Sequence, residues 1–196
     1  ALVGITICEK ESELAYKVNV EGTKNIVNAA KNTKSKIIYI STDYVFDGKK
    51  GMYKESDEPN PINYYGKTKQ EGEKLINLKN NVIIRTSIFG WNIVKERKSF
   101  STWIIDELTN NKKINVFFDQ LNSMMLVNNC AEALKEIIDK DLTGIWNIAS
   151  SERISKYDFA IRLAELFNLD KSLMSPIKNN DIAGYEKRPL DVSLDV

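Results

Sequence analysis

The chain has 196 residues, with 28 Lys and Arg, 27 Asp and Glu, two Cys and no His. A formal net charge of +1 offers no broad basic field for nucleic acid, and the lack of His excludes a Ser-His-Asp triad and any His metal ligand. Proton chemistry therefore falls to Tyr, Lys, Cys, Asp or Glu, and no metal site is expected. Cys8 and Cys130 lie far apart and are expected to be reduced thiols of a cytoplasmic protein, and the apolar runs are too short to span a membrane.

The elements predicted along the chain alternate between helices and strands. A helix is expected over residues 12–32, with Ser12 as N-cap and an apolar face that includes Leu14, Val18 and Ile26. Strands are expected over residues 36–41, 82–86, 114–118 and 145–149, and further helices over 63–78, 100–110, 128–139 and 156–167. Residues 47–63 are predicted to be a loop, and the tail from Asn168 to be irregular. This alternation predicts an α/β fold with a βαβ-wound parallel sheet.

Polar residues follow two of the predicted strands at the point where each strand ends. Residues 41–44 (Ser-Thr-Asp-Tyr) follow one strand, and Thr86 and Ser87 end or follow another. Ligands of open α/β sheets bind at this edge, so these side chains are candidates for a site. The alternative is a pair of strand-end turns in which the same side chains bond their own backbone.

Tyr65 and Lys69 are four residues apart, so on a helix they share one face. An ammonium beside a phenol lowers the pKa of the phenol, which would suit Tyr65 to donate a proton to a carbonyl oxygen during reduction. A hydroxyl such as that of Thr42 could hold the same oxygen. By itself the spacing is weak evidence, because one such pair is expected by chance, and the alternative is a solvated helix face.

Several motifs occur in one order along the chain and carry a family resemblance. They are STDYVFDG at 41–48, Pro-x-x-x-Tyr-Gly-x-Thr-Lys-x-x-Gly-Glu at 61–73, Arg-Thr-Ser at 85–87, and the segments 119–120, 144–149, 157–160 and 188–195. Together they resemble the extended short-chain dehydrogenase/reductase superfamily, and within it the dTDP-4-dehydrorhamnose reductase branch. The resemblance implies a Rossmann-like doubly wound parallel sheet in residues 1–150 and a small substrate-binding lobe in residues 151–196, with parts of 119–128 as further contributors to that lobe.

The resemblance also implies a role for each matching catalytic residue. Tyr65 is the expected proton donor. Lys69 is expected to bond the nicotinamide ribose and to lower the pKa of Tyr65. Thr42 is the expected third member, which bonds the substrate carbonyl.

Binding residues follow from the same resemblance. Beside Tyr65 and Lys69, the expected contacts to the NADP or NAD cofactor are Arg85, Thr86 and Ser87. The expected contacts to a nucleotide-sugar substrate are Asp43, Tyr44, Ile88 and Arg188. No nucleic-acid or membrane partner is expected, and a homodimer is left open.

The implied activity is NAD(P)H-dependent reduction of the 4-keto group of a nucleotide-linked deoxysugar, with Tyr65 as proton donor. In the related 4,6-dehydratases the Thr is followed by Asp-Glu, whereas here Asp43 is followed by Tyr44. The missing second carboxylate disfavours dehydration and leaves reduction or an epimerase-like cycle. A non-catalytic role stays open as well, because the regulatory β subunit of methionine adenosyltransferase resembles the same branch.

The sequence departs from the family pattern in three places. Ile88 stands where the family often has an aromatic residue, and residues 119–125 (DQLNSMM) lack the Gly and Pro usual in that segment, so the substrate is expected to differ from dTDP-4-dehydrorhamnose. The nine glycines form no Gly-x-x-Gly-x-x-Gly turn, which holds the cofactor pyrophosphate in the family. Residues 1–3 resemble the end of the family's fourth strand, so the first βα units are expected to be missing. A longer protein, a short chain and a partner chain that supplies those units are the three explanations left open.

Overall fold

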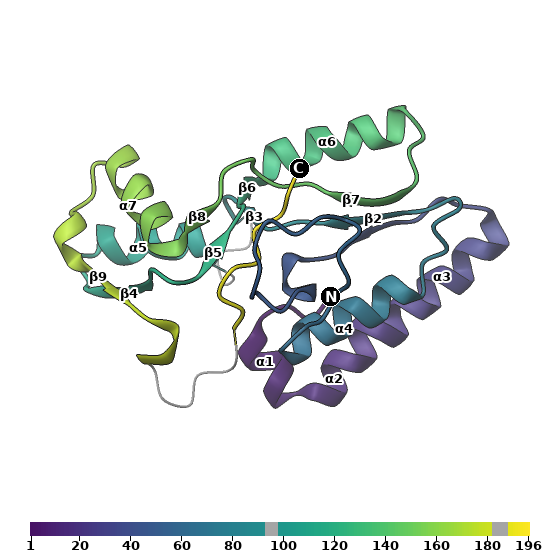
Figure 1. The fold of residues 1–196 in the computed structure, drawn as a ribbon, viewed down its shortest axis with the longest axis horizontal. Helices are drawn as coiled ribbons and strands as arrows, with labels where there is room; N and C mark the ends of the chain where they lie inside the picture. The colour runs from purple at the N-terminus through teal and green to yellow at the C-terminus, as the bar shows by residue number, and fades with distance from the viewer. Residues whose placement is uncertain (93–97, 182–187) are drawn as a thin grey trace.

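The computed structural model describes residues 1–92, 98–181 and 188–196, and its centre is a three-stranded parallel sheet (Figure 1). The strand order is β1 (Ile38–Ile40), β2 (Val82–Arg85) and β7 (Gly144–Asn147). Helix α6 (Val127–Asp139) covers one face, while α3 (Gly22–Thr33) and α4 (Tyr64–Lys74) cover the other. This arrangement confirms the predicted α/β class and its parallel sheet.

The central strand β2 shows why this sequence forms a buried sheet. All four of its residues are buried, and the β-branched side chains alternate between the two faces. Val82 and Ile84 pack in one cluster with Ile137 of α6, whereas Ile83 packs in another with Tyr39 and with Ile76, which follows α4. A strand covered on both faces needs such a continuous apolar run.

The N-terminal segment differs from the single helix that was predicted. Residues 1–4 form no strand, and α1 (Ile5–Lys10), α2 (Ser12–Tyr16), a π-helical turn at Lys17–Glu21 and α3 follow in succession. Ser12 is the first residue of α2 and Glu11 precedes it, so the prediction of Ser12 as N-cap is wrong. The break at Glu11 separates α1 from α2.

The predicted apolar face of this segment is also wrong in part. Leu14, Val18 and Ile26 are 47%, 41% and 63% exposed, whereas Asn19 and Val20 are buried. A π-helical turn holds one residue more than an α-helical turn, so it changes which residues of the following turn face the core. Sequence periodicity assumes one constant period and therefore cannot place such a face correctly.

The remaining predicted helices are confirmed within a few residues at each end. They are α4, α5 (Phe100–Thr109), α6 and α7 (Lys156–Leu166). Three of them begin with a side-chain cap: Asn63, Ser99 and Ser155 accept a hydrogen bond from a backbone N–H of the first turn of α4, α5 and α7.

A second group of elements packs around its own core, at the left of Figure 1. It contains α5, α7, β4 (Ile114–Phe117) and β9 (Met174–Ile177), and its buried cluster includes Ile104, Val116, Ala160 and Met174. Strand β4 pairs in parallel with β9 and not with the central sheet. The proposed division of the chain at residue 150 stays a prediction.

The prediction of an irregular tail is wrong at β9. Pro176 lies within this strand, opposite Val116 of β4. A proline has no N–H to donate, but a strand paired on one edge only can tolerate it. Short 3₁₀ turns at Lys171–Leu173 and Asn179–Asp181 flank the strand.

Two further pairs of short strands and the C-terminal segment connect the two groups. Strand β3 (Ile88–Phe89) pairs in parallel with β6 (Met125–Leu126), and β5 (Leu121–Asn122) pairs antiparallel with β8 (Ile154–Ser155). Leu194 forms a bridge with Tyr53, and it is buried in a cluster with Val192, Val45 and Phe46. The last residues of the chain are therefore part of the core beside the central sheet.

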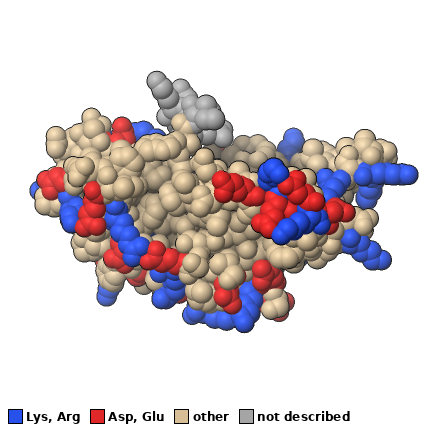
Figure 2. Space-filling view, turned by 90° about the horizontal axis from the view of Figure 1, so that it is seen from above, with Lys and Arg blue, Asp and Glu red and all other residues tan. Residues whose placement is uncertain are grey.

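The surface in Figure 2 carries Lys, Arg, Asp and Glu in alternation and shows no large patch of one sign. Ion pairs such as Lys135 with Asp139 on α6 belong to this pattern. Cys8 and Cys130 are free and buried, as predicted for reduced thiols. No helix among the described residues is long and apolar enough to cross a membrane.

Gly72 of α4 lies against strand β1, and a Cβ at this position would be 2.1 Å from the hydroxyl oxygen of Tyr39. We expect Gly72→Ala to lower the free energy of unfolding by about 1–3 kcal/mol, because the helix must move away from the strand. Urea unfolding followed by circular dichroism would measure the change.

Gly22→Ala is the matched control, because Gly22 has helical dihedral angles and its nearest neighbour would lie 3.8 Å from the new Cβ. This variant should be about 0.4–1 kcal/mol more stable than the wild type. Equal stabilities of the two variants would contradict close packing at Gly72.

Candidate active site

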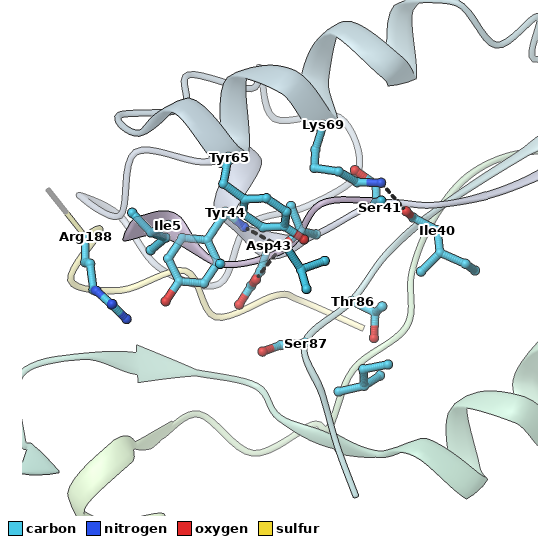
Figure 3. Close-up of a pocket in the computed structure, with 15 residues that line it drawn as sticks. Ile5, Ile40, Ser41, Asp43, Tyr44, Tyr65, Lys69, Thr86, Ser87 and Arg188 are labelled. Atoms are coloured by element: carbon cyan, nitrogen blue, oxygen red, sulfur yellow. Dashed lines mark hydrogen bonds between the residues drawn. The ribbon is translucent and has the colours of Figure 1, made fainter. Parts of the chain in front are cut away.

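The carboxyl ends of β1 and β2 open into one cavity of about 510 Å³ (Figure 3). Apart from Arg85, every candidate site residue lines this cavity: Thr42, Asp43, Tyr44, Tyr65, Lys69, Thr86, Ser87, Ile88 and Arg188. Asp43, Tyr44 and Tyr65 lie on one side of it in Figure 3, and Ser87 lies on the strand-end loop opposite. Side chains from four separate stretches of the sequence therefore meet at one edge of the sheet.

Thr42 begins a 3₁₀ turn at Asp43–Val45 directly after β1. Its Oγ1 accepts a hydrogen bond from the Tyr44 N–H at 3.2 Å and donates one to Asp43 Oδ1 at 3.0 Å. Thr42 thus bonds the backbone of its own turn, and it also lines the cavity at the end of the strand. The turn that Thr42 caps holds its hydroxyl in the wall of the cavity.

Helix α4 carries Tyr65 and Lys69 to the same cavity. Its first turn is closed by Asn63, whose side chain accepts from the Gly66 N–H at 2.8 Å. A Cβ at Gly66 would lie 2.2 Å from the Tyr44 carbonyl oxygen, so only glycine allows the helix to contact the Thr42 turn this closely. The glycine between Tyr65 and Lys69 therefore sets how near the phenol comes to Thr42.

The Tyr65 phenol keeps its proton over a wide pH range. Burial raises the pKa of Tyr65 far above its ordinary value, a hydrogen bond with Thr42 opposes the rise, and the charge of Asp43 adds to it. The edge of its ring also meets the Tyr44 ring, with centroids 6.3 Å apart.

Lys69 was expected to lower the pKa of Tyr65, but the pKa of Tyr65 is raised overall, with burial as the largest cause. Its Nζ donates to the Ile40 carbonyl oxygen at 2.7 Å and lies 4.1 Å from the centre of the Tyr39 ring. Burial lowers the pKa of Lys69 to about 8, and the charge of Glu73 partly opposes that change. The ammonium is directed toward β1 as well as toward the cavity.

Asp43 is the most deeply buried charged group of the site, at 1% exposure. Its Oδ2 accepts from Asn122 Nδ2 at 2.7 Å. Burial raises the pKa of Asp43 to about 6, while hydrogen bonds from Asn122, Thr42 and Ser87 and the charge of Lys156 oppose the rise. This carboxyl therefore titrates close to neutral pH.

Tyr44 and Arg188 meet on the side of the cavity away from β2 (Figure 3). Burial raises the pKa of Tyr44 to about 12, with the charge of Asp43 in the same direction and Arg188 in the opposite one. Arg188 belongs to the C-terminal segment, so its side chain reaches the site from the far end of the sequence. Ile88 lines the cavity at 50% exposure.

Arg85 does not line the cavity, although the sequence places it among the cofactor contacts. Its Nη2 lies 2.8 Å from Glu73 Oε2, its Nε donates to Glu73 Oε1 at 3.2 Å, and its Nη1 donates to the Glu55 carbonyl oxygen. These bonds hold the guanidinium against Glu73 of α4 and the Glu55 backbone, away from the cavity.

Sequence reasoning missed Asn19, which is buried in the π-helical turn. Its side chain accepts from the Leu2 N–H at 2.7 Å and donates to the Leu2 carbonyl oxygen and to Thr68 Oγ1, each at 3.0 Å. These bonds join residues at the rim of the cavity to α4. Asn19 stands between Val18 and Val20, which was the available signal, but periodicity alone did not indicate its burial.

The remaining lining residues are small or apolar for the most part, and only Ser41 belongs to a motif: Ala1, Val3, Gly4, Ile5, Ile40 and Ser41. Within the described residues no three His, Cys, Asp or Glu gather as they would to hold a metal ion. One ammonium, one guanidinium, several hydroxyls and two phenols instead suit a ligand rich in hydroxyl and carbonyl oxygens, such as a ribose or a sugar.

Comparison with curated proteins gives relatives of two kinds. Methionine adenosyltransferase 2 subunit beta of Bos taurus is 33% identical over 198 residues, which cover 96% of this chain and 59% of that protein. dTDP-4-dehydrorhamnose reductase of Aggregatibacter actinomycetemcomitans is 32% identical over 210 residues, which cover all of this chain and 70% of that protein. The chain thus spans about three fifths of the length of the bovine relative.

Solved structures of dTDP-4-dehydrorhamnose reductases also match this chain. The hypothetical dTDP-4-dehydrorhamnose reductase from Sulfolobus tokodaii matches with a TM-score of 0.88 and 39% identity, over 100% of this chain and 68% of that one. The dTDP-4-dehydrorhamnose reductase of Bacillus anthracis in complex with NADP matches with a TM-score of 0.91 and 28% identity, over 99% of this chain and 69% of that one.

The family model described as RmlD substrate binding domain matches residues 3–196. This match covers nearly the whole chain, and the fold agrees with it. The chain therefore belongs to the RmlD substrate binding domain family, in the Rossmann-fold branch that includes the dTDP-4-dehydrorhamnose reductases.

Proposed function

We propose that this chain carries the catalytic site of an NAD(P)H-dependent reductase that acts on the 4-keto group of a nucleotide-linked deoxysugar. The observation that carries the proposal is the meeting of Thr42, Tyr65 and Lys69 in one cavity. Similarity to dTDP-4-dehydrorhamnose reductases, one of them solved with NADP, supports the cofactor and the substrate class.

A reduced nicotinamide bound in this cavity would supply a hydride to the keto carbon. Tyr65 donates its phenolic proton to the oxygen of that carbonyl, which becomes strongly basic as the hydride arrives. Because burial keeps Tyr65 protonated, the proton is present when the oxygen needs it. The Thr42 hydroxyl, which donates to Asp43 in the structure, would turn to donate a second hydrogen bond to the same oxygen.

The other lining residues have binding roles in this proposal. Lys69 donates to the hydroxyls of the nicotinamide ribose, and Thr86 and Ser87 lie beside the nicotinamide. Arg85 has no contact role, because its guanidinium is engaged by Glu73.

Substrate contacts come from the opposite side of the cavity, where Asp43, Tyr44 and Arg188 meet, and from Ile88. Dehydration of a sugar needs an added acid and base, and a tyrosine occupies the position after Asp43. Tyr44 titrates near pH 12, so it remains a neutral phenol at physiological pH. This favours simple reduction over dehydration.

A second candidate function is regulatory, and a specific observation favours it. Relatives named methionine adenosyltransferase 2 subunit beta are up to 33% identical over 96% of this chain. In this case the protein would bind a catalytic subunit and change its activity.

Two assays on one preparation separate the candidates: oxidation of NAD(P)H in the presence of dTDP-4-dehydrorhamnose, and the rate of a methionine adenosyltransferase catalytic subunit with and without this protein.

Tyr65→Phe removes the proposed proton donor and leaves the ring in place. We expect the rate of NAD(P)H-dependent ketone reduction to fall by roughly 10²–10⁴-fold, because no other group donates the proton in the transition state. Cofactor affinity, measured by fluorescence titration, should change little.

Tyr64→Phe is the matched control, since Tyr64 is the preceding residue of α4 and does not line the cavity. This variant should reduce the substrate at the wild-type rate. Wild-type turnover by Tyr65→Phe would rule out the proton-donor role.

The protonation state of Lys69 is expected to set the pH dependence of cofactor binding. Burial lowers its pKa to about 8, so the ammonium predominates below this pH and is lost above it. NAD(P)H affinity should therefore weaken as the pH rises through about 8. Lys69→Met should bind more weakly and lose this pH dependence, and an unchanged pH profile in that variant would contradict the role of Lys69.

A further inference from the structure

The side chain of Glu73 lies at the point where α4 meets the ends of β1 and β2. It is 7% exposed, and it lies one helical turn beyond Lys69. Ser41 Oγ donates to Glu73 Oε1 at 2.5 Å, and Arg85 donates to both carboxylate oxygens, at 3.2 and 2.8 Å. One carboxylate therefore receives hydrogen bonds from the last residue of β2 and from the residue that follows β1.

The two donors occupy equivalent positions in the chain. Ser41 directly precedes Thr42, and Arg85 directly precedes Thr86. Each is the last residue before a loop whose side chains line the cavity. A displacement of Glu73 would thus be transmitted to both loops and to the helix that carries the Tyr and Lys of the site.

The ion pair is almost completely closed to solvent, with the Arg85 side chain at 3% exposure. The guanidinium also bonds the Glu55 carbonyl oxygen at 3.2 Å and lies 5.1 Å from the centre of the Phe46 ring. A buried ion pair gains stability only when further hydrogen bonds satisfy both groups, and Ser41 and Glu55 supply them here.

Glu73 is also the acidic group that acts on Lys69. The ionisable groups around the Lys69 ammonium are Tyr65 and Glu73 on α4 and Tyr39 on β1, with Arg85 of β2 on the far side of Glu73. Burial disfavours the charged form of Lys69, and the negative charge of Glu73 favours it.

We propose that Glu73 is a positioning residue of the site, which fixes α4 against the ends of β1 and β2 and places its negative charge one helical turn from Lys69. Its effect on turnover rests on the proposed reductase function. Its effect on Lys69 does not, and that effect is measurable in the absence of any substrate.

The first experiment follows the titration of Lys69 by NMR of the protein with ¹³C-labelled lysine side chains, with Lys69→Met to identify the signal. Glu73→Gln should shift the midpoint of the Lys69 titration downward by about one pH unit, because an attractive charge is lost and the Arg85 charge is left unopposed. Glu71→Gln is the matched control: Glu71 lies on the same helix, is exposed and pairs with Lys74. The midpoint of the Lys69 titration in Glu71→Gln should equal that in the wild type.

Two further variants keep the test decisive if Glu73→Gln does not fold with an unpaired Arg85. The double variant Glu73→Gln/Arg85→Met removes both charges and should still lower the midpoint. Glu73→Asp keeps the charge but is one methylene shorter, so the midpoint should stay while kcat falls at least about tenfold and KM for the keto sugar changes little.

An unchanged Lys69 midpoint in Glu73→Gln, or in the double variant, would overturn the electrostatic part of the proposal. Wild-type kcat in Glu73→Asp would overturn the positioning part. Failure of the proposed function would appear differently, as a wild-type protein that reduces no keto sugar while its Lys69 titration still responds to Glu73→Gln.

Discussion

The ion pair between Glu73 and Arg85 joins helix α4 to strand β2, and a hydrogen bond from Ser41 adds strand β1 to the same carboxylate. Two charges in a space without water are stable only together, since the loss of one partner would cost roughly 3–5 kcal/mol. The pair therefore holds the helix close to the sheet. That close approach requires Gly66 and Gly72, where any side chain would meet the Tyr44 backbone or the Tyr39 hydroxyl.

Burial disfavours the charged forms of Asp43, Tyr65 and Lys69 in the cavity, because these groups lose contact with water. It raises the pKa of Asp43 to about 6 and that of Tyr65 well above its usual range, and it lowers the pKa of Lys69 to about 8. The Tyr65 phenol therefore carries its proton at neutral pH. A site of this kind suits the neutralisation of a carbonyl oxygen that gains negative charge, which is the chemistry of ketone reduction.

The relatives of this chain include both dTDP-4-dehydrorhamnose reductases and proteins named methionine adenosyltransferase 2 subunit beta, and one fold can host different roles. The distinction therefore depends on the side chains of the site. Thr42, Tyr65 and Lys69 are all present and all line the cavity, which supports catalysis. Two residues from later in the chain also reach this site: the Asn122 amide donates to Asp43, and Arg188 lines the cavity.

The sequence alone determined the α/β class and the principal strands and helices, because these depend on local patterns such as β-branched runs and helical periodicity. The family resemblance, carried by short motifs, predicted most of the residues that line the cavity. The sequence could not reveal the face on which a residue at a strand end lies, so Arg85 was expected beside the cofactor. It could not reveal the π-helical turn that buries Asn19, or that β4 pairs with β9 outside the central sheet. Those features were decided by tertiary structure, because they depend on which distant segments pack together and which buried polar groups they must satisfy.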